Sequence, residues 1–223
     1  MIELVAISVA DIPETWAALG FGVHDNHTTV GHTRHDFLGT STEAGKGIVA
    51  WTLQGDGLEG VTSIEGLPTT VVTGVTTPPT DAPLGHSNGV TSIDHLVLMT
   101  PDVERTVSTL ERLGLPCRRR RQGEAYGKPM SQAFFWLGDP DGGDADKVVL
   151  EVVGSPDVDP QAAEQPARFF GIAYTVANLE ATGAFLGDLM KAPVDAVQPG
   201  RQITTISSKA GATVAIALMT PHQ

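Results

Sequence analysis

His95 and Glu151 are the two residues whose types and surroundings best suit chemistry. Each is a lone ionisable side chain inside an apolar, strand-like run, Ile93–Met99 for the histidine and Val148–Val153 for the carboxylate. Burying a carboxylate among valines costs several kcal/mol, roughly, unless a cation, a proton or hydrogen-bond donors compensate it. Glu151 therefore needs a partner, and the repeat pattern described below brings His95 near it.

Both residues also have a plain structural interpretation. Glu151 could lie on an edge strand whose face is open to water, and a histidine on an apolar strand is often a satisfied core residue. The valines on both sides of Glu151 favour a functional role. Gln132, on an adjacent predicted strand, could orient an oxygen, and simple strand polarity explains it equally well. Tyr126, Phe135 and Trp136 are candidates for lining the same site, although aromatic residues in strands are more often core.

Charge and composition exclude several classes of protein. The chain of 223 residues carries a formal net charge of −12, which argues against binding duplex DNA or an anionic membrane, since both need a basic surface. No apolar stretch approaches the roughly 20 residues that span a bilayer, and the start lacks a basic signal segment, so we expect a cytoplasmic protein. The single cysteine, Cys117, excludes an internal disulfide and a multi-cysteine zinc site.

A run of four arginines, Arg118–Arg121, stands out from this acidic background. Such a run could bind a carboxylate or a phosphate. The lack of interleaved aromatic residues favours a solvated strand edge that discourages edge-to-edge pairing.

The chain repeats one pattern three times: an apolar strand, a polar cap, and a short amphipathic helix that ends at Leu-Gly. The three copies run from Leu4 to Gly20, from His95 to Gly114 and from Ile172 to Gly187. In the middle copy, Thr100 is expected to cap the helix and Pro101 to occupy its first position. Three strands are predicted after that helix, at Cys117–Gln122, Ser131–Leu137 and Lys147–Val153. The repeating unit is therefore β-α-β-β-β.

These repeats divide the chain into two parts. Residues 1–75 form a degenerate N-terminal half, residues 76–91 a Pro- and Gly-containing linker, and residues 92–223 two paired modules at 92–154 and 167–221. Within the first part, Ile48–Gln54 is either the closing strand of the first unit or the opening strand of a second unit that has lost its helix. The similarity of Gly47–Leu53 to Gly171–Val176 favours the second interpretation.

The tandem arrangement resembles the vicinal oxygen chelate (VOC) superfamily, which includes glyoxalase I, extradiol dioxygenases, methylmalonyl-CoA epimerase and bleomycin-resistance proteins. The segments His86–Val90, Gln132–Phe135, Val149–Gly154 and Ala196–Arg201 look like those of a glyoxalase-like subgroup common in actinobacteria. The resemblance implies an α+β fold in which tandem βαβββ modules pair into cupped mixed sheets with helices on the outside.

The resemblance also implies a site. In the superfamily, a His or Gln on the first strand of a module and a Glu on its fourth strand hold a divalent metal, and His95 and Glu151 match those positions. Their donor atoms suit Fe, Mn, Ni, Co or Zn. The corresponding positions in the other modules are Gly171, Leu4 and the stretch Val214–Leu218, which offer no ligand. Candidates for a third ligand are His24, His27, His32, His35, His86 and His222, each explained more simply as a surface or hydrogen-bonded histidine.

The expected function is that of a glyoxalase-like protein acting on a small oxygenated molecule by metal-assisted or Glu151-based proton transfer, with His95 and Gln132 as further catalytic residues. Lyase, isomerase and dioxygenase chemistry all stay open. The alternative is a non-catalytic small-molecule or drug-binding protein of the same fold. No nucleic-acid or membrane partner is expected, and a homodimer is plausible because superfamily domains often exchange modules.

Overall fold

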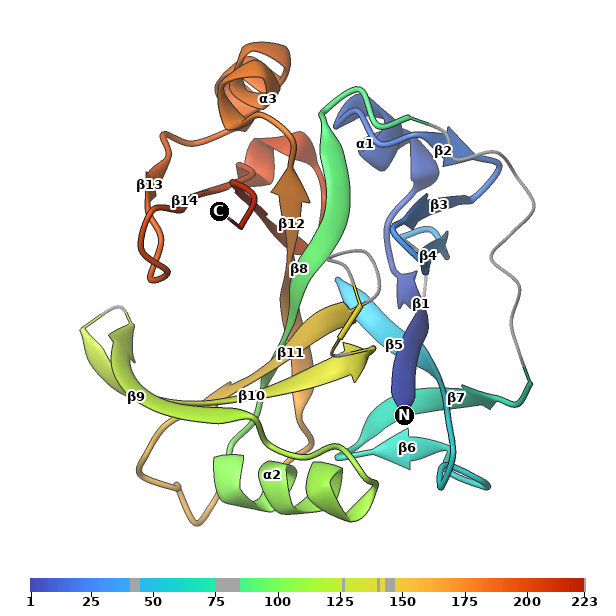
Figure 1. The fold of residues 1–223 in the computed structure, drawn as a ribbon, viewed down its shortest axis with the longest axis vertical. Coiled ribbons are helices and arrows are strands. Elements are labelled where there is room, and N and C mark those ends of the chain that lie inside the picture. The colour runs from blue at the N-terminus through green and yellow to red at the C-terminus, as the bar shows by residue number, and fades with distance from the viewer. Residues whose placement is uncertain (41–44, 75–84, 126, 140, 143–146, 223) are drawn as a thin grey trace.

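The computed structural model describes residues 1–40, 45–74, 85–125, 127–139, 141–142 and 147–222, and its strands form two curved mixed sheets (Figure 1). The N-terminal sheet has the order β2-β3-β4-β1-β5-β7-β6. Its strands are β1 (Ile2–Val9), β2 (Val23–His24), β3 (His27–Val30), β4 (Thr33–Phe37), β5 (Ile48–Gly55), β6 (Ser63–Ile64) and β7 (Leu67–Val72).

The C-terminal sheet has the order β13-β14-β15-β12-β8-β11-β10-β9. Its strands are β8 (Val90–Met99), β9 (Arg119–Ala125), β10 (Lys128–Gly138), β11 (Lys147–Gly154), β12 (Arg168–Val176), β13 (Val194–Asp195), β14 (Gln202–Thr205) and β15 (Ala215–Met219). The helices are α1 (Pro13–Ala18), α2 (Val103–Arg112) and α3 (Leu179–Leu186), with 3-10 turns at Gly187–Leu189 and Ser208–Ala210. No helix among these described residues is long and apolar enough to cross a membrane.

Each sheet consists of two units joined through their antiparallel first strands. In the C-terminal sheet, β8 and β12 pair antiparallel at the centre, and each is parallel to the last strand of its own unit, β11 or β15. The N-terminal sheet repeats this arrangement around β1 and β5. The predicted fold class is confirmed: tandem βαβββ modules pair into cupped mixed sheets with helices outside.

The second unit is the degenerate one. Strand β5 is antiparallel to β1 and parallel to β7, which is the position of an opening strand, as the second interpretation of Ile48–Gln54 predicted. Residues 56–62, which are all described, form turns and irregular backbone where the other units have a helix. The strands β3, β6 and β7 were not predicted from the sequence.

The start of α2 differs from the prediction. Asp102 caps the helix, because its extended backbone lets the short carboxylate accept the Arg105 N–H at 2.9 Å. Thr100 Oγ1 instead lies 2.8 Å from Thr106 Oγ1, and Pro101 precedes the helix. The fully buried Val107 and Leu110 pack this helix on β10 and β11.

One hydrophobic core continues across both sheets. The buried Tyr174 of β12 donates its hydroxyl to His35 Nε2 of β4 at 2.7 Å, and Trp51 of β5 packs edge-on against Phe169 of β12 with ring centroids 5.4 Å apart. The N-terminal half therefore covers one side of the C-terminal sheet around β8 and β12, while α2 lies below β10 (Figure 1). The opposite, concave side of the C-terminal sheet carries the candidate site.

Candidate functional site

The three predicted site residues come together on the concave face of the C-terminal sheet. His95 lies on β8, Glu151 on β11 and Gln132 on β10, which are neighbouring strands. The Gln132 Nε2 amide donates to Glu151 Oε1, and His95 Nε2 lies 3.7 Å from Glu151 Oε2. The partner that a carboxylate among valines required is thus an amide on one side and an imidazole on the other.

The positions of these side chains exclude the edge-strand interpretation of Glu151. Strand β11 lies between β8 and β10, so Glu151 is not on an edge strand. The side chains of His95 and Glu151 are 17% and 13% exposed, which leaves both accessible from the concave side although neither is surface-exposed. The separation of 3.7 Å between Nε2 and Oε2 is longer than a good hydrogen bond, so a substrate atom can contact both groups.

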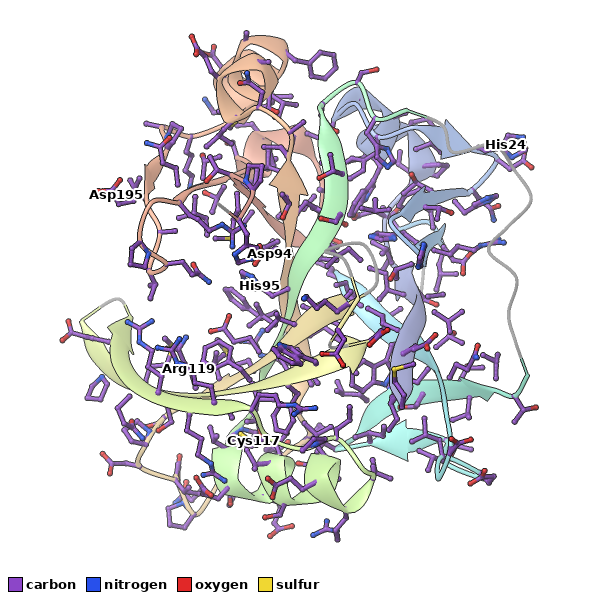
Figure 2. The ribbon with its side chains drawn as sticks, viewed as in Figure 1. His24, Asp94, His95, Cys117, Arg119 and Asp195 are labelled. Carbon is purple, nitrogen blue, oxygen red and sulfur yellow. The ribbon has the colours of Figure 1, made fainter. Side chains whose placement is uncertain are left out.

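A β-bulge in β8 places a fourth residue, Asp94, on this face. Ile93 pairs with Tyr174 and His95 with Ala173, so Asp94 is an extra residue without a partner on β12. Because of the bulge, Ile93 and Leu96 are both buried in the core while Asp94 and His95 both project from the concave side, as Figure 2 shows. Asp94 Oδ1 lies 2.8 Å from His95 Nδ1.

Asp94 is in turn held by a buried arginine. Arg201 Nη2 donates to Asp94 Oδ2 at 2.5 Å, and the side chains are 2% and 5% exposed. Burial raises the pKa of Asp94, but the hydrogen bond and charge of His95, together with those of Arg201, outweigh it and lower this pKa to about 2. Arg201 also donates to the Thr220 carbonyl and lies 3.0 Å from His222 Nε2. The site is therefore a continuous polar chain from Gln132 to His222.

The sequence reasoning missed Asp94 and Arg201. An acidic residue directly before a candidate histidine is a visible signal, but strict strand alternation assigns the two to opposite faces. Arg201 lies more than 100 positions from Asp94 along the chain, and nothing in its local sequence indicates burial.

The three aromatic candidates for lining the site have different positions. Phe135 is fully buried in the core. Trp136 is half-buried and lies on the same face as His95, because both residues pair with Val149. Tyr126 lies outside the described residues.

The donor set does not fit a metal centre of three protein ligands. Within the described ranges, no group of three or more His, Cys, Asp and Glu side chains could hold a metal ion, so the set ends at His95 and Glu151. His35 of the N-terminal sheet contacts Tyr174, and His86 contacts the Thr29 carbonyl. His24, His27 and His32 lie in or beside strands of the N-terminal sheet. His222 contacts Arg201 and lies 3.7 Å from Asp94 Oδ2 rather than beside Glu151. Two ligands alone bind a divalent ion weakly.

Comparisons with known proteins support the architecture. No protein-family model and no curated protein matches this sequence. A triple mutant of 4-hydroxymandelate synthase from Streptomyces coelicolor superposes with a TM-score of 0.65 and 14% identity, over 99% of this chain and 92% of that one. Methylmalonyl-CoA epimerases from Streptomyces coelicolor and Mycobacterium tuberculosis reach TM-scores of 0.45 and 0.44, with 19% and 16% identity, over 60% of this chain and 99% and 91% of theirs.

The synthase likeness extends over 99% of the chain and carries the assignment of the fold. The epimerase superpositions, with TM-scores below 0.5, add nothing to it. At 14% identity the likeness concerns the fold and not the reaction. The chain has the fold of the vicinal oxygen chelate superfamily.

Proposed function

We propose that this protein is an enzyme that moves a proton on a small oxygenated molecule, with Glu151 as the base. The observation that carries the proposal is the facing pair of Glu151 Oε2 and His95 Nε2, 3.7 Å apart on a concave face and each fixed from behind. Gln132 holds the other oxygen of Glu151, and Asp94 holds the other nitrogen of His95. Two reactive atoms that are oriented in advance suit general acid–base catalysis.

The proton transfer follows from this geometry. Glu151 Oε2 takes a proton from the carbon next to a carbonyl group, and the electron pair of that C–H bond forms an enolate with its charge on the carbonyl oxygen. A protonated His95 donates its Nε2–H to that oxygen, since Nδ1–H is engaged by Asp94. When Glu151 returns the proton to a neighbouring atom, the product is an isomer. When a solvent proton reaches the original carbon from the opposite face and Glu151 releases its proton to solvent, the product is an epimer. In both cases His95 recovers its proton from the enol oxygen. No step is routed through a metal ion.

The test measures exchange of carbon-bound hydrogen. Wild-type protein is incubated in D₂O with a panel of small hydroxy and oxo compounds, and loss of the hydrogen next to the carbonyl is followed by ¹H NMR. We expect Glu151→Gln to slow exchange by about 10²–10⁴-fold, while Glu111→Gln, an exposed change on α2, leaves the rate unchanged. A folded Glu151→Gln protein that exchanges at the wild-type rate would contradict the proposal.

A non-catalytic binding protein is the second candidate. This alternative is favoured by the last unit, which contains β12 to β15. There the small residues Gly171 of β12 and Ala215 of β15 pair in register on the concave face and offer no reactive group. In that case ligands bind to wild type and to Glu151→Gln alike and are recovered without deuterium. We also propose that residues 1–75 support residues 92–223 structurally. A homodimer would be detected as a doubled molecular mass in solution.

A further inference from the structure

The arginine run on β9 splits between the two faces of the sheet. Arg120 points to the outer side, where its guanidinium pairs with Glu104 of α2. Arg119 pairs in register with Phe134, and Arg121 with Gln132, so both belong to the concave face that carries Glu151. Figure 2 shows Arg119 on the same side of the sheet as Asp94 and His95.

These two inward arginines lack a partner among the residues that the structure describes. Neither guanidinium makes a hydrogen bond or an ion pair with any residue in the described part of the chain. The carboxylate Asp94 is already paired with Arg201, and Glu151 is held by Gln132. Lys147 and Arg118 add further positive charge around Trp136, at 5.8 and 5.0 Å from its ring centroid. The concave face therefore carries local positive charge in a chain whose net charge is −12.

Gln132 links the two arginines to the reactive pair. Its Oε1 is buried without a hydrogen-bond partner among the described residues, and the residue is only 8% exposed. A Cβ built on Gly123 would lie 3.6 Å from this oxygen and 3.9 Å from Arg121 Nε and Nη2, so the amide and the guanidinium lie over the same glycine. A buried acceptor without a partner is costly, so Gln132 Oε1 favours a ligand that carries a donor such as a hydroxyl, while the two unpaired guanidinium groups favour an anionic group on the same ligand.

We propose that Arg119 and Arg121 bind the anionic group, a carboxylate or a phosphate, of the substrate. Neighbouring strands lie about 4.8 Å apart, and β9 is two strands from β11, so a guanidinium on β9 reaches a group only a few bonds from an atom at Glu151. The subsite selects small anionic molecules and places the C–H bond at Glu151 Oε2. This inference rests on the proposed function for the role of Glu151 but not for binding itself.

The test measures binding without turnover. Succinate, its uncharged diamide and inorganic phosphate are titrated into the full chain at low salt, and binding is followed by NMR shifts and by calorimetry. We expect an anion to bind wild type and the diamide not to bind, with preference for succinate or for phosphate identifying the chemistry. Arg119→Ala and Arg121→Ala should each weaken binding about tenfold, which corresponds to one charge-assisted contact.

Two controls separate this inference from the proposed function. Arg120→Ala removes an equal charge from the same strand on the outer side, so binding should stay within twofold of wild type. Glu151→Gln should retain anion binding even though its proton exchange is lost. Equal binding by Arg120→Ala and the inward variants, equal binding of the diamide, or no anion binding to wild type at millimolar concentration would each overturn the subsite.

Discussion

Asp94 and His95 are consecutive residues whose side chains lie on the same face of β8, with Asp94 Oδ1 2.8 Å from His95 Nδ1. This relationship depends on the bulge, because a regular strand would send one of them into the core. It also connects the candidate site to a buried ion pair, since the other oxygen of Asp94 accepts from Arg201. Stability and site geometry therefore depend on the same carboxylate.

The first prediction concerns that carboxylate. Asp94→Asn leaves the buried Arg201 without a counter-charge and should lower the free energy of unfolding by about 3 kcal/mol. Urea denaturation at pH 7 measures the loss. Asp195→Asn, an exposed change on β13, is the control and should unfold like wild type; equal midpoints for the two variants would contradict the ion-pair role.

Acid should weaken the protein through His35. Burial lowers the pKa of His35 to about 3, against a hydrogen bond to the Thr33 carbonyl that acts the other way. Because this pKa is lower in the folded protein, the unfolded chain takes up the proton at a higher pH than the folded protein does. The contribution of His35 to the free energy of unfolding is therefore complete above pH 6.5 and is lost as the pH falls toward 3. The free energy of unfolding should fall by about 3 kcal/mol between pH 7 and pH 4, and the lowered pKa of His86 acts in the same direction.

Matched histidine variants check the assignment. His35→Gln keeps hydrogen-bonding capacity but has no group that titrates. The variant should therefore have a lower free energy of unfolding than wild type at pH 7 and should lose less of it on acidification. His24→Gln, whose side chain is 55% exposed in wild type, should retain the full pH dependence. Denaturant curves at pH 7, 5.5 and 4 give the free energy of unfolding of the three proteins as a function of pH. The same pH dependence in His35→Gln as in wild type would exclude His35 as its source.

Glu65 fastens the N-terminal half to α2. Its carboxylate, 7% exposed, accepts from Arg105 Nε at 2.8 Å and from the hydroxyls of Thr106 and Thr109 at 2.9 and 2.6 Å. Glu65→Gln should cost about 2 kcal/mol, measured by thermal and urea unfolding. Glu59→Gln, an exposed change, serves as the control. A loss of unfolding free energy in Glu65→Gln no larger than in that control would show that the contacts of Glu65 with α2 do not contribute to stability.

The contact between β12 and β15 requires a glycine at position 171. A Cβ there would collide with the Ala215 backbone oxygen and lie 2.9 Å from its Cβ. Gly171→Ala should therefore destabilise the protein by about 3 kcal/mol, whereas Gly123→Ala, whose added carbon meets nothing closer than 3.6 Å, should change little. Comparable unfolding midpoints for both variants would contradict the packing argument.

Metal removal provides a further check on the site. With two candidate ligands, a divalent ion binds weakly and contributes little to folding. Dialysis against a chelator should leave the melting temperature and the proton exchange of wild type unchanged. Elemental analysis that found near-stoichiometric metal in wild type, lost in both His95→Ala and Glu151→Ala, would instead establish a metal centre whose further ligand is not among the described side chains.

Local sequence patterns were sufficient for the type of architecture and for part of the site. Apolar runs, caps and turn residues repeat along the chain, and they predict βαβββ units because each signal acts over a few residues. The mismatch of Glu151 with its valine neighbours also indicated, from the sequence alone, a residue that needs a partner. His95 and Gln132 followed from their positions in the same unit.

Only the tertiary structure decided which further residues join the site and which side chains face it. These features depend on contacts between residues that are distant in sequence, or on a departure from regular strand alternation. The bulge turns Asp94 to the same face as His95, and Arg201 reaches Asp94 from the other unit. The register of β9 with β10 decides which arginines of the run face inward. Register and long-range burial depend on how whole strands pair and pack. A shift of the strand register by one residue would move every side chain of that strand to the other face of the sheet.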